Sequence, residues 1–453
     1  MSYQKLAVLI LLSTAIFFLQ HAGMQNQWDF HAYILNGEYW FHHGRYFSPM
    51  RPPLVPFILG LLGFVSRGFA EYGYILFASA LFAFSSVRLA RVLRLPPVWF
   101  YALVCSAYLM THGLNEGTEL LNFAFLELFV GSLLLERFAG HWLGLMILSR
   151  YTGVAFAPLL IFRRKEAWKD VVLCALTLFS WLAYNYLKFG NPLTSFADLY
   201  ANNIYSRVTI AHPWRIEHFA EVGGLSLPLI LIGAFWRPVR RENVMMAVIA
   251  FLTTVSYANI PFKNSRFLFS LALPAGVWAA EGLKFLATRI GKVGADIVAW
   301  ALFIVNFMFS LSTLANARAG MSLYINAIED LKRRNLDHCS IESNGWVELN
   351  YYGLLSKPCP YRETLAKEIR SGEIVLLFRQ IKDPPYAQNP RALAEFPVIS
   401  ETDRYVILGN GCKPAEPYTE LFAHRFADYF QATRGYRSEE RPLYLLFGSF
   451  HIL

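Results

Sequence analysis

Apolar stretches recur along the first 315 residues, and short polar or basic segments separate them. Their lengths approach the roughly 17–25 residues that a helix needs to cross a bilayer. The first run, Leu6–Leu19, is interpreted as an uncleaved span, because no clear small-residue cleavage site of a signal peptide follows it. The pattern predicts a polytopic α-helical membrane protein with about nine full spans, near residues 6–20, 72–88, 97–113, 119–135, 168–186, 222–236, 244–260, 267–283 and 295–314.

Two further apolar segments do not fit this series of spans. The segment Leu54–Ser66 has only about 13 residues, too few to cross, so we expect an outer juxtamembrane helix that lies along the interface. The segment Gly140–Phe162 has basic residues on both flanks and cannot cross once without inverting every later loop. We interpret it as a re-entrant pair of half-helices, interrupted around Ser149–Gly153.

The character of the sequence changes after about residue 315, where charged residues, prolines and turn residues become frequent. Strand-like runs alternate with helix-like runs there, which is typical of a small α/β domain; the runs are Leu323–Arg334, Cys339–Ile341, Ile374–Phe378 and Tyr405–Leu408. We therefore divide the chain into a transmembrane domain at 1–314, which includes a first outer loop at 21–71, and an extracytoplasmic α/β domain at 315–453.

Composition and charge support a membrane class and argue against nucleic-acid binding. The 453 residues are 55% hydrophobic and 16% charged, whereas soluble domains carry about 25% charged residues. The formal net charge of +9 need not indicate a nucleic-acid partner, because cytoplasmic loops of polytopic proteins concentrate Lys and Arg. No face with interleaved basic and aromatic residues stands out, so membrane lipid is the expected partner rather than nucleic acid.

The distribution of basic residues predicts which side each loop occupies. Most of them fall on one face if the N-terminus is cytoplasmic: Lys5, Arg88, Arg91, Arg94, Arg137, Arg163, Arg164, Lys165, Lys169, Arg237, Arg240, Arg241, Lys284, Arg289 and Lys292. The opposite face holds fewer, among them Arg45, Arg51, Arg67, Lys188, Lys263 and Arg266. The positive-inside rule therefore places the N-terminus in the cytoplasm and the C-terminal domain outside.

The five cysteines divide by region. Cys105 and Cys174 lie inside apolar segments, where a thiol behaves as a small packing residue. Cys339, Cys359 and Cys412 lie in the polar C-terminal part. If that part faces an oxidising compartment, Cys339 and Cys359 are candidates for a disulfide, which would leave one thiol over.

Asp29 and Arg51 are the strongest candidates for chemistry. Asp29 stands in the first polar segment after the first apolar run, and Tyr33 follows it at helical spacing. Arg51 precedes two prolines at the same outer boundary. The structural alternatives are an N-cap for Asp29 and a snorkelling anchor for Arg51. A carboxylate and a cation held at one boundary can together transfer a group from a lipid phosphate, so we predict a catalytic acid–base role for Asp29 and phosphate binding by Arg51.

Further charged residues accompany these two in or beside the predicted spans. Lys263 and Arg266 precede the eighth span on the outer side and are candidate phosphate ligands. Glu116 and Glu119 precede the fourth span, where acidic residues also stabilise the helix dipole, and Glu119 is the preferred second catalytic carboxylate. Arg150 lies inside an apolar segment at a cost of roughly 2.5–3.5 kcal/mol, which predicts a partner or a wet substrate cavity around it.

The sequence offers no recognisable cofactor or metal motif. His31, His42 and His43 have only a weak resemblance to metal-ligand spacing, and no further ligands complete the set. A phosphate-binding loop, a dinucleotide fingerprint and a nucleophile elbow are also lacking. Because basic side chains supply the charge that a leaving phosphate needs, we expect no cofactor and no required metal.

An ordered set of motifs resembles the glycosyltransferase-C superfamily, most closely the branch of protein O-mannosyltransferases and lipid A aminoarabinose transferases (family 39-like). Each motif is weak alone, but together they extend over about 270 residues; they are Asp29, Arg51–Leu54, Leu148–Gly153, Asn185–Tyr186, Phe189–Leu193, Arg266–Phe267 and Pro274. In one departure Phe30 follows Asp29, where the relatives often carry a second acid, and this bears on the choice of acceptor. The Trp-Trp-Asp signature of oligosaccharyltransferases is absent.

The resemblance implies an inverting glycosyltransferase that moves a sugar, a hexose or a pentose, from a polyprenyl-phosphate donor. The acceptor would be a lipid, glycan or protein on the outer side of the membrane. By the same resemblance Asp29 activates the acceptor, Arg51 contacts the lipid phosphate, and Arg150 matches a basic position in the core. The alternative function is a transporter or flippase of lipid-linked sugars, but transporters often carry internal repeats, and none stands out here.

Overall fold

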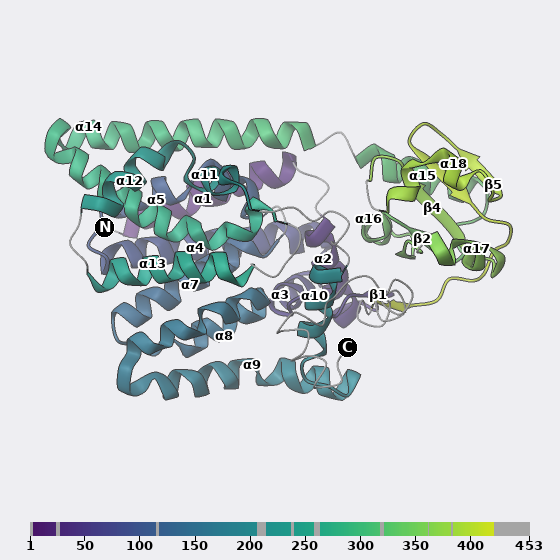
Figure 1. Cartoon of the computed structure of the whole chain (residues 1–453), viewed down its shortest axis with the longest axis horizontal. Helices are drawn as coiled ribbons and strands as arrows, with labels where there is room; N and C mark the ends of the chain where they lie inside the picture. Colours follow the sequence, from purple (N-terminus) through teal and green to yellow (C-terminus); the bar gives the residue numbers. More distant parts are fainter. Residues whose placement is uncertain are drawn as a thin grey trace.

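A long helical bundle and a smaller α/β unit make up the molecule in this computed structural model (Figure 1). The structure describes residues 3–23, 28–114, 117–205, 214–236, 240–257, 263–317, 321–360, 362–381 and 384–420. The helical part comes first in the chain, and the α/β unit occupies the described residues from 321 to 420. We call residues 321–420 the C-terminal unit.

The helical part is built, over its described residues, from α-helices with 3₁₀ segments and one short strand among them. Its first half contains α1 (Tyr3–Gly23), α2 (Trp28–Phe41), β1 (Tyr46–Phe47), α3 (Leu54–Leu62), α4 (Arg67–Val92), α5 (Pro97–Val104), α6 (Ala107–His112), α7 (Glu119–Leu134), α8 (Gly140–Ser149) and η1 (Tyr151–Glu166). Its second half contains α9 (Ala167–Phe189), α10 (Thr194–Tyr205), α11 (Ile216–Gly223), η3 (Gly224–Ser226), α12 (Leu227–Trp236), α13 (Arg241–Ser256), η4 (Ser265–Leu271) and α14 (Ala272–Ala317).

The chain is an integral membrane protein. Among the described residues four helical stretches are long and apolar enough to cross a bilayer: Arg67–Val92, Ala167–Phe189, Ile216–Trp236 and Ser265–Ser312. Large apolar side chains on these stretches are exposed, for example Phe179, Phe235 and Phe309. Such exposure is costly in water and ordinary in lipid, so these surfaces face the hydrocarbon.

The breaks between helices have local causes. The predicted span 97–113 is two helices, because Cys105 leaves helical geometry and the Ser106 side chain then accepts from the Leu109 N–H and begins α6. Arg150 is extended and separates α8 from η1, within the interval where the sequence predicted an interruption. The predicted spans 267–283 and 295–314 fall largely within α14, on either side of a sharp break at Gly291, which has φ +76°.

The loops at one end of the bundle are rich in basic residues and contact one another. Arg241 donates to the Glu136 carboxylate at 3.0 Å and to the Phe162 carbonyl at 2.7 Å. Lys284 donates to the Arg94 carbonyl at 3.3 Å. The structure thus gathers loops that the charge pattern assigned to one face, while α2, α3 and the C-terminal unit lie toward the other end (Figure 1).

The C-terminal unit is a mixed sheet between helices. Its elements are α15 (Met321–Arg333), β2 (Ile341–Ser343), α16 (Trp346–Tyr351), β3 (Ser356–Pro358), α17 (Arg362–Arg370), β4 (Ile374–Phe378), η6 (Pro385–Gln388), α18 (Pro390–Leu393), β5 (Val398–Glu401), β6 (Tyr405–Leu408) and β7 (Tyr418–Thr419). The five-stranded sheet has the order β3-β2-β4-β6-β5, in which β2 pairs parallel with β3 and β4, and β6 pairs antiparallel with β4 and β5.

Side chains along the central strand β4 alternate between two hydrophobic layers, as the pleat of a strand requires. Ile374, Leu376 and Phe378 pack with α15 and α16, whereas Val375 and Leu377 pack with α17. Burial on both faces explains why β4 is one continuous apolar run, and the sequence placed this strand and β6 correctly.

The predicted pairing of Cys339 with Cys359 is wrong. Cys339 is joined to Cys412, and Cys359 is a buried cysteine outside this disulfide, whose Sγ lies 3.0 Å from the Tyr386 hydroxyl. The reason is the course of the segment that follows β6. The Lys413 carbonyl accepts from the Ser340 N–H at 2.6 Å, so the chain at Cys412 runs beside Cys339, while Cys359 faces the α17 side of the sheet.

Candidate functional site

Asp29 lies in the first turn of α2, at the end of the bundle nearer the C-terminal unit. Its two carboxylate oxygens have different guanidinium partners. Arg51 donates to Oδ1 at 2.5 Å, and Arg266 donates to Oδ2 at 2.8 Å. The side chain is 16% exposed, so the two ion pairs are shielded from most of the solvent. The helix dipole also stabilises an acid in the first turn, but the two guanidinium partners show that Asp29 has a role beyond starting the helix.

Arg51 is fixed by the loop that leads into α3. The Asn36 side chain of α2 pins this loop, since it donates to the Ser48 carbonyl at 2.7 Å and accepts from the Ser48 N–H at 2.8 Å. The Arg51 guanidinium lies over the Tyr33 ring, 5.6 Å from the centroid. Burial alone would lower the pKa of Arg51, but the Asp29 carboxylate and the Tyr33 and Tyr46 side chains together outweigh it and raise that pKa, so the group stays charged.

Glu119 is a second acid, fully buried at the first position of α7. Its Oε1 accepts from Arg266 Nε at 2.7 Å and from Arg150. Its Oε2 accepts from the Thr118 hydroxyl at 3.2 Å. Arg150 reaches this carboxylate because the chain is extended between α8 and η1. Its Nη2 lies 3.4 Å from the Tyr257 hydroxyl.

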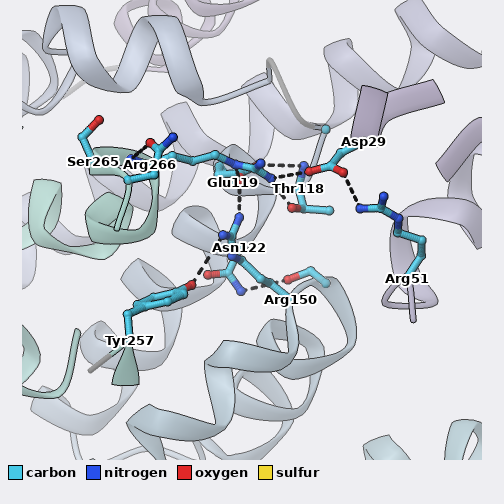
Figure 2. Close-up of polar contacts among 12 residues, drawn as sticks. Asp29, Arg51, Thr118, Glu119, Asn122, Arg150, Tyr257, Ser265 and Arg266 are labelled. Carbon is cyan, nitrogen blue, oxygen red and sulfur yellow. Dashed lines mark hydrogen bonds and ion pairs between the residues drawn. The ribbon is translucent and has the colours of Figure 1, made fainter. Parts of the chain in front are cut away.

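Together these side chains form an alternating row of charges, Arg51–Asp29–Arg266–Glu119–Arg150, which we call the ionic row (Figure 2). Three guanidinium groups face two carboxylates, so the row carries one positive charge in excess. Ionised groups removed from water persist only when each has a good partner, and alternation supplies one on every side. The excess charge makes the row a natural place for a phosphate group.

A small cavity adjoins the inner end of the ionic row. Glu119, Arg150 and Tyr257 line it together with hydroxyl-bearing and aromatic side chains from η1, α13 and η4. Its volume is about 10 Å³, which is close to the space that one water molecule needs. The inner end of the row is thus closely packed, with a small polar cavity beside it.

The structure brings together six of the eight residues that the sequence proposed for the site: Asp29, Tyr33, Arg51, Glu119, Arg150 and Arg266. Lys263 lies at the margin, where its ammonium donates to the Tyr257 carbonyl at 2.6 Å and faces the Trp214 ring. Glu116 falls outside the described residues.

Sequence reasoning missed the neutral residues that surround the charges. Tyr257, at the end of α13, is one of them, and its ring stacks on Phe267 with centroids 4.7 Å apart. Asn122 is another, and its amide donates to the Met146 carbonyl at 2.8 Å and so holds the end of α8 near α7. A single Tyr or Asn in an apolar run has no distinctive pattern, so neither could be recognised before the fold was known.

The candidate metal ligands among the described residues lie in the C-terminal unit, away from the ionic row. Within the described ranges one group of three potential ligand residues has its atoms close enough to share an ion, namely His338, Cys339 and Cys412. Both cysteines of that group are consumed by the disulfide. A thiolate pair is therefore not available there while the bond is intact.

Comparison with known proteins identifies the fold. No protein-family model and no curated protein sequence matches the chain. Among solved structures, ArnT from Cupriavidus metallidurans bound to undecaprenyl phosphate matches with a TM-score of 0.65 and 10% identity, over 90% of this chain and 98% of that one. ArnT in the apo state matches with a TM-score of 0.61 at 10% identity, over 89% of this chain and 97% of that one. This chain has the glycosyltransferase-C fold.

A third glycosyltransferase-C structure extends the comparison. The arabinofuranosyltransferase AftD from Mycobacteria matches with a TM-score of 0.55 and 12% identity, over 92% of this chain and 40% of that one. Because the identities are so low, these matches establish a shared fold and leave residue roles to be argued from geometry. The glycosyltransferase-C fold that the sequence motifs implied is thus confirmed.

Proposed function

We propose that this protein is an inverting glycosyltransferase that transfers a sugar from a polyprenyl-phosphate donor to an acceptor hydroxyl. One observation carries the proposal: a carboxylate, Asp29, is held between Arg51 and Arg266 in a glycosyltransferase-C fold. A carboxylate can take a proton from an attacking hydroxyl, and guanidinium groups can bind a phosphate. Undecaprenyl phosphate, which is bound to ArnT in one of the similar structures, belongs to the class of leaving group that this mechanism requires.

The reaction balances with these groups alone. The acceptor oxygen forms a bond to the anomeric carbon while the bond from that carbon to the phosphate oxygen breaks. The acceptor proton passes to Asp29, and the electron pair of the broken bond stays on the departing polyprenyl phosphate. Attack from the face opposite the phosphate inverts the anomeric centre. Positioned general-base catalysis of this kind contributes roughly 10²–10⁴-fold to the rate.

The ionic row suits the change in charge during this step. The leaving phosphate gains negative charge, and Arg51 and Arg266 stand ready to neutralise it. A bound phosphate competes with Asp29 for the same two guanidinium groups. As these turn toward the phosphate, the carboxylate becomes freer to accept a proton, so donor binding would also prepare the base. Glu119, with Arg150 behind it, keeps Arg266 oriented throughout.

The side of the membrane follows from the charge pattern. The basic loops contact one another at the end of the bundle that contains Arg94, Glu136 and Lys284. If that end is cytoplasmic, as the positive-inside rule predicts, the N-terminus is cytoplasmic, and the ionic row and the C-terminal unit face the outer compartment. We therefore place the transfer on the extracytoplasmic side.

The decisive experiment compares the wild-type protein with Asp29→Asn. Purified protein in lipid vesicles receives a radiolabelled polyprenyl-phosphate sugar together with an envelope fraction as the source of acceptor. We expect transfer or donor hydrolysis by the wild type, and a loss of at least about 10²-fold in Asp29→Asn, because an amide cannot act as the base. Asp330→Asn is the matched control, since this carboxylate of α15 pairs with Arg334, away from the row.

The outcomes separate an enzyme from a carrier. Full turnover in a folded Asp29→Asn protein would refute the proposed role of Asp29. Movement of the labelled donor across the vesicle membrane, with no cleavage of the sugar–phosphate bond, would favour a transporter or flippase instead. The anomeric configuration of the product, measured by nuclear magnetic resonance, tests inversion separately.

A further inference from the structure

Asp29 and Arg51 lie on two separate segments, α2 and the loop after β1. One short helix of the C-terminal unit, α16, contacts α2 and the strand β1, which leads into that loop. Figure 1 places α16 at the side of the unit that faces α2 and β1. The C-terminal unit thus lies against the two segments that carry Asp29 and lead to Arg51.

The first contact fixes the beginning of α2. The Trp28 ring, one residue before Asp29, meets the Trp346 ring edge-to-face with centroids 4.5 Å apart. Two residues after Asp29, His31 Nδ1 lies 2.6 Å from Glu348 Oε2, and both side chains are almost completely buried. Asp29 is thus bracketed on α2 by residues that α16 holds.

The second contact fixes the strand that leads to Arg51. β1 pairs parallel with β7, with Tyr46 opposite Tyr418. The Tyr46 hydroxyl donates to the buried Glu420 carboxylate, and Trp346 Nε1 lies 3.3 Å from the same hydroxyl. Trp346 therefore contacts both α2 and β1: its ring packs on Trp28, and its N–H faces the Tyr46 hydroxyl.

The helix α16 is itself held firmly. Asn350 donates to the Ser356 carbonyl at 2.6 Å, which ties α16 to β3. The Tyr351 ring stacks on His31 with centroids 3.6 Å apart, and its hydroxyl donates to Glu71 of α4 at 2.7 Å. The C-terminal unit and the bundle thus grip α2 between them.

We propose that α16 aligns Asp29 with Arg51, and that Trp346 and Glu348 are positioning residues for the reaction. The effect on catalysis rests on the proposed function, whereas the contact of α16 with α2 and β1 does not. General-base catalysis requires the base within hydrogen-bond reach of its proton, and a displacement of about 1 Å can reduce the rate by about 10²-fold. Substrate does not need to touch either residue for this effect.

The first test measures steady-state transfer for variants of the two residues. We expect Glu348→Ala and Trp346→Ala to lower kcat by about 10–100-fold while the donor KM changes by less than about 3-fold. Glu348→Gln keeps an oxygen that accepts from His31, so it is expected to restore most of the rate. Trp346→Phe keeps an aromatic ring beside Trp28 but loses the N–H and part of the ring area, so it is expected to be intermediate.

A matched control separates positioning from general damage to the C-terminal unit. Glu373→Ala removes another buried carboxylate of that unit, whose contacts with Lys357 and Lys413 lie inside it. It is expected to leave kcat near the wild-type value. In an Asp29→Asn background, Glu348→Ala should cause little further loss, since residues that act through one group are not additive.

The second test does not depend on catalysis. Amide hydrogen exchange of residues 28–41 and 46–51 is expected to be faster in Glu348→Ala and Trp346→Ala than in the wild type, with α7 unchanged. Unchanged exchange and unchanged kcat in both variants would overturn the inference. So would an equal loss of kcat in Glu373→Ala. If the wild-type protein showed no transfer, the proposed function would be wrong. The hydrogen-exchange rates would still test whether α16 holds α2 and β1 in place.

Discussion

Arg51 and Arg266 show how a membrane protein keeps ionised groups together at low cost. Each guanidinium contacts Asp29, and Arg266 also contacts Glu119. Removing one partner from such a set leaves a buried charge without its counter-charge, at a cost of about 3–5 kcal/mol. Because each guanidinium already pairs with a carboxylate, an anion that enters the row must replace one of these ion pairs in order to bind.

A phosphate role for Arg51 predicts a specific loss of lipid binding. We expect Arg51→Ala to weaken binding of undecaprenyl phosphate by about 10-fold or more, since a hydrogen bond to a charged group contributes about 1.5–3 kcal/mol. Arg51→Lys keeps the charge but loses the planar fork, so an intermediate loss is expected. Titration calorimetry of the purified protein with this lipid measures both variants.

The same Arg51 variants are also tested for binding of acceptor, and the two affinities are compared. Arg45→Ala is the matched control, because this arginine donates to the Ala415 carbonyl and lies away from the ionic row. If Arg51→Ala weakened binding of acceptor as much as binding of the lipid, its proposed contact with the phosphate would be wrong.

At the residue scale, part of the site was predictable from the sequence. The scarcity of outer-side cations singled out Arg51 and Arg266, and the cost of a membrane arginine singled out Arg150. Their mutual contacts could not be predicted, because Arg266 meets Asp29 across 237 positions of sequence. Only the packing of α7, η4 and α2 brings those positions together.

At the scale of elements, α12 and α14 show how small residues permit a close helix crossing. A Cβ on Gly282 would lie 2.0 Å from the Leu229 carbonyl oxygen, and a Cβ on Gly233 would lie 1.8 Å from the Trp278 oxygen. Backbone contact of this kind replaces the hydrophobic driving force that lipid does not supply.

Gly282→Ala is therefore expected to destabilise the bundle by about 1–3 kcal/mol or more, because the added methyl group meets backbone atoms that cannot move aside. Thermal unfolding in detergent measures the loss. Gly68→Ala in α4 is the control, since its Cβ would meet nothing within 4 Å and alanine favours a helix. Equal melting temperatures for the two variants would contradict the close crossing.

Apolar periodicity predicted the positions of the helices better than their continuity. The run 97–113 is largely apolar, yet the helix breaks at Cys105 and a new helix begins at Ala107, with Ser106 as its N-cap. A serine inside an apolar run is as compatible with a continuous helix as with a cap, so the sequence could not decide between them. The interruption near Arg150 was predictable because basic flanks constrained the topology.

At the scale of the whole molecule, the C-terminal unit depends on a few buried polar contacts. Glu373 bridges Lys413 at 2.9 Å and Lys357 at 3.5 Å. Burial alone would raise the pKa of Glu373, but the nearby Ser340 side chain, the hydrogen bond from Lys413 and the charge of Lys357 outweigh it, so the pKa is lower than the usual 4.5. A lowered pKa in the folded state means that the ionised carboxylate stabilises the fold.

This stabilisation is present above pH 4.5 and is lost as the pH falls through the lowered pKa of Glu373. We expect Glu373→Gln to cost about 1 kcal/mol at neutral pH, less than a fully buried pair because Lys413 is half-exposed. The difference in melting temperature from the wild type should shrink as the pH is lowered toward about 3. A difference independent of pH would contradict the ionic bridge.

The topology of the C-terminal unit was only partly predictable. The apolar runs of β4 and β6 marked two strands, but β3 is short and polar and β5 has only two apolar residues, and a sequence pattern does not separate such strands from loops. The partner of Cys339 depends on where the chain passes after β6, which spacing alone does not determine.

The parallel pairing of β1 with β7 also has a consequence for biosynthesis. A ribosome completes Tyr46 long before it reaches Tyr418, so the first outer loop must wait for most of the chain before its partner strand emerges. A polypeptide that terminates before this point would lack the strand that pairs with β1. The pairing therefore forms only after the last described segment of the chain has been synthesised.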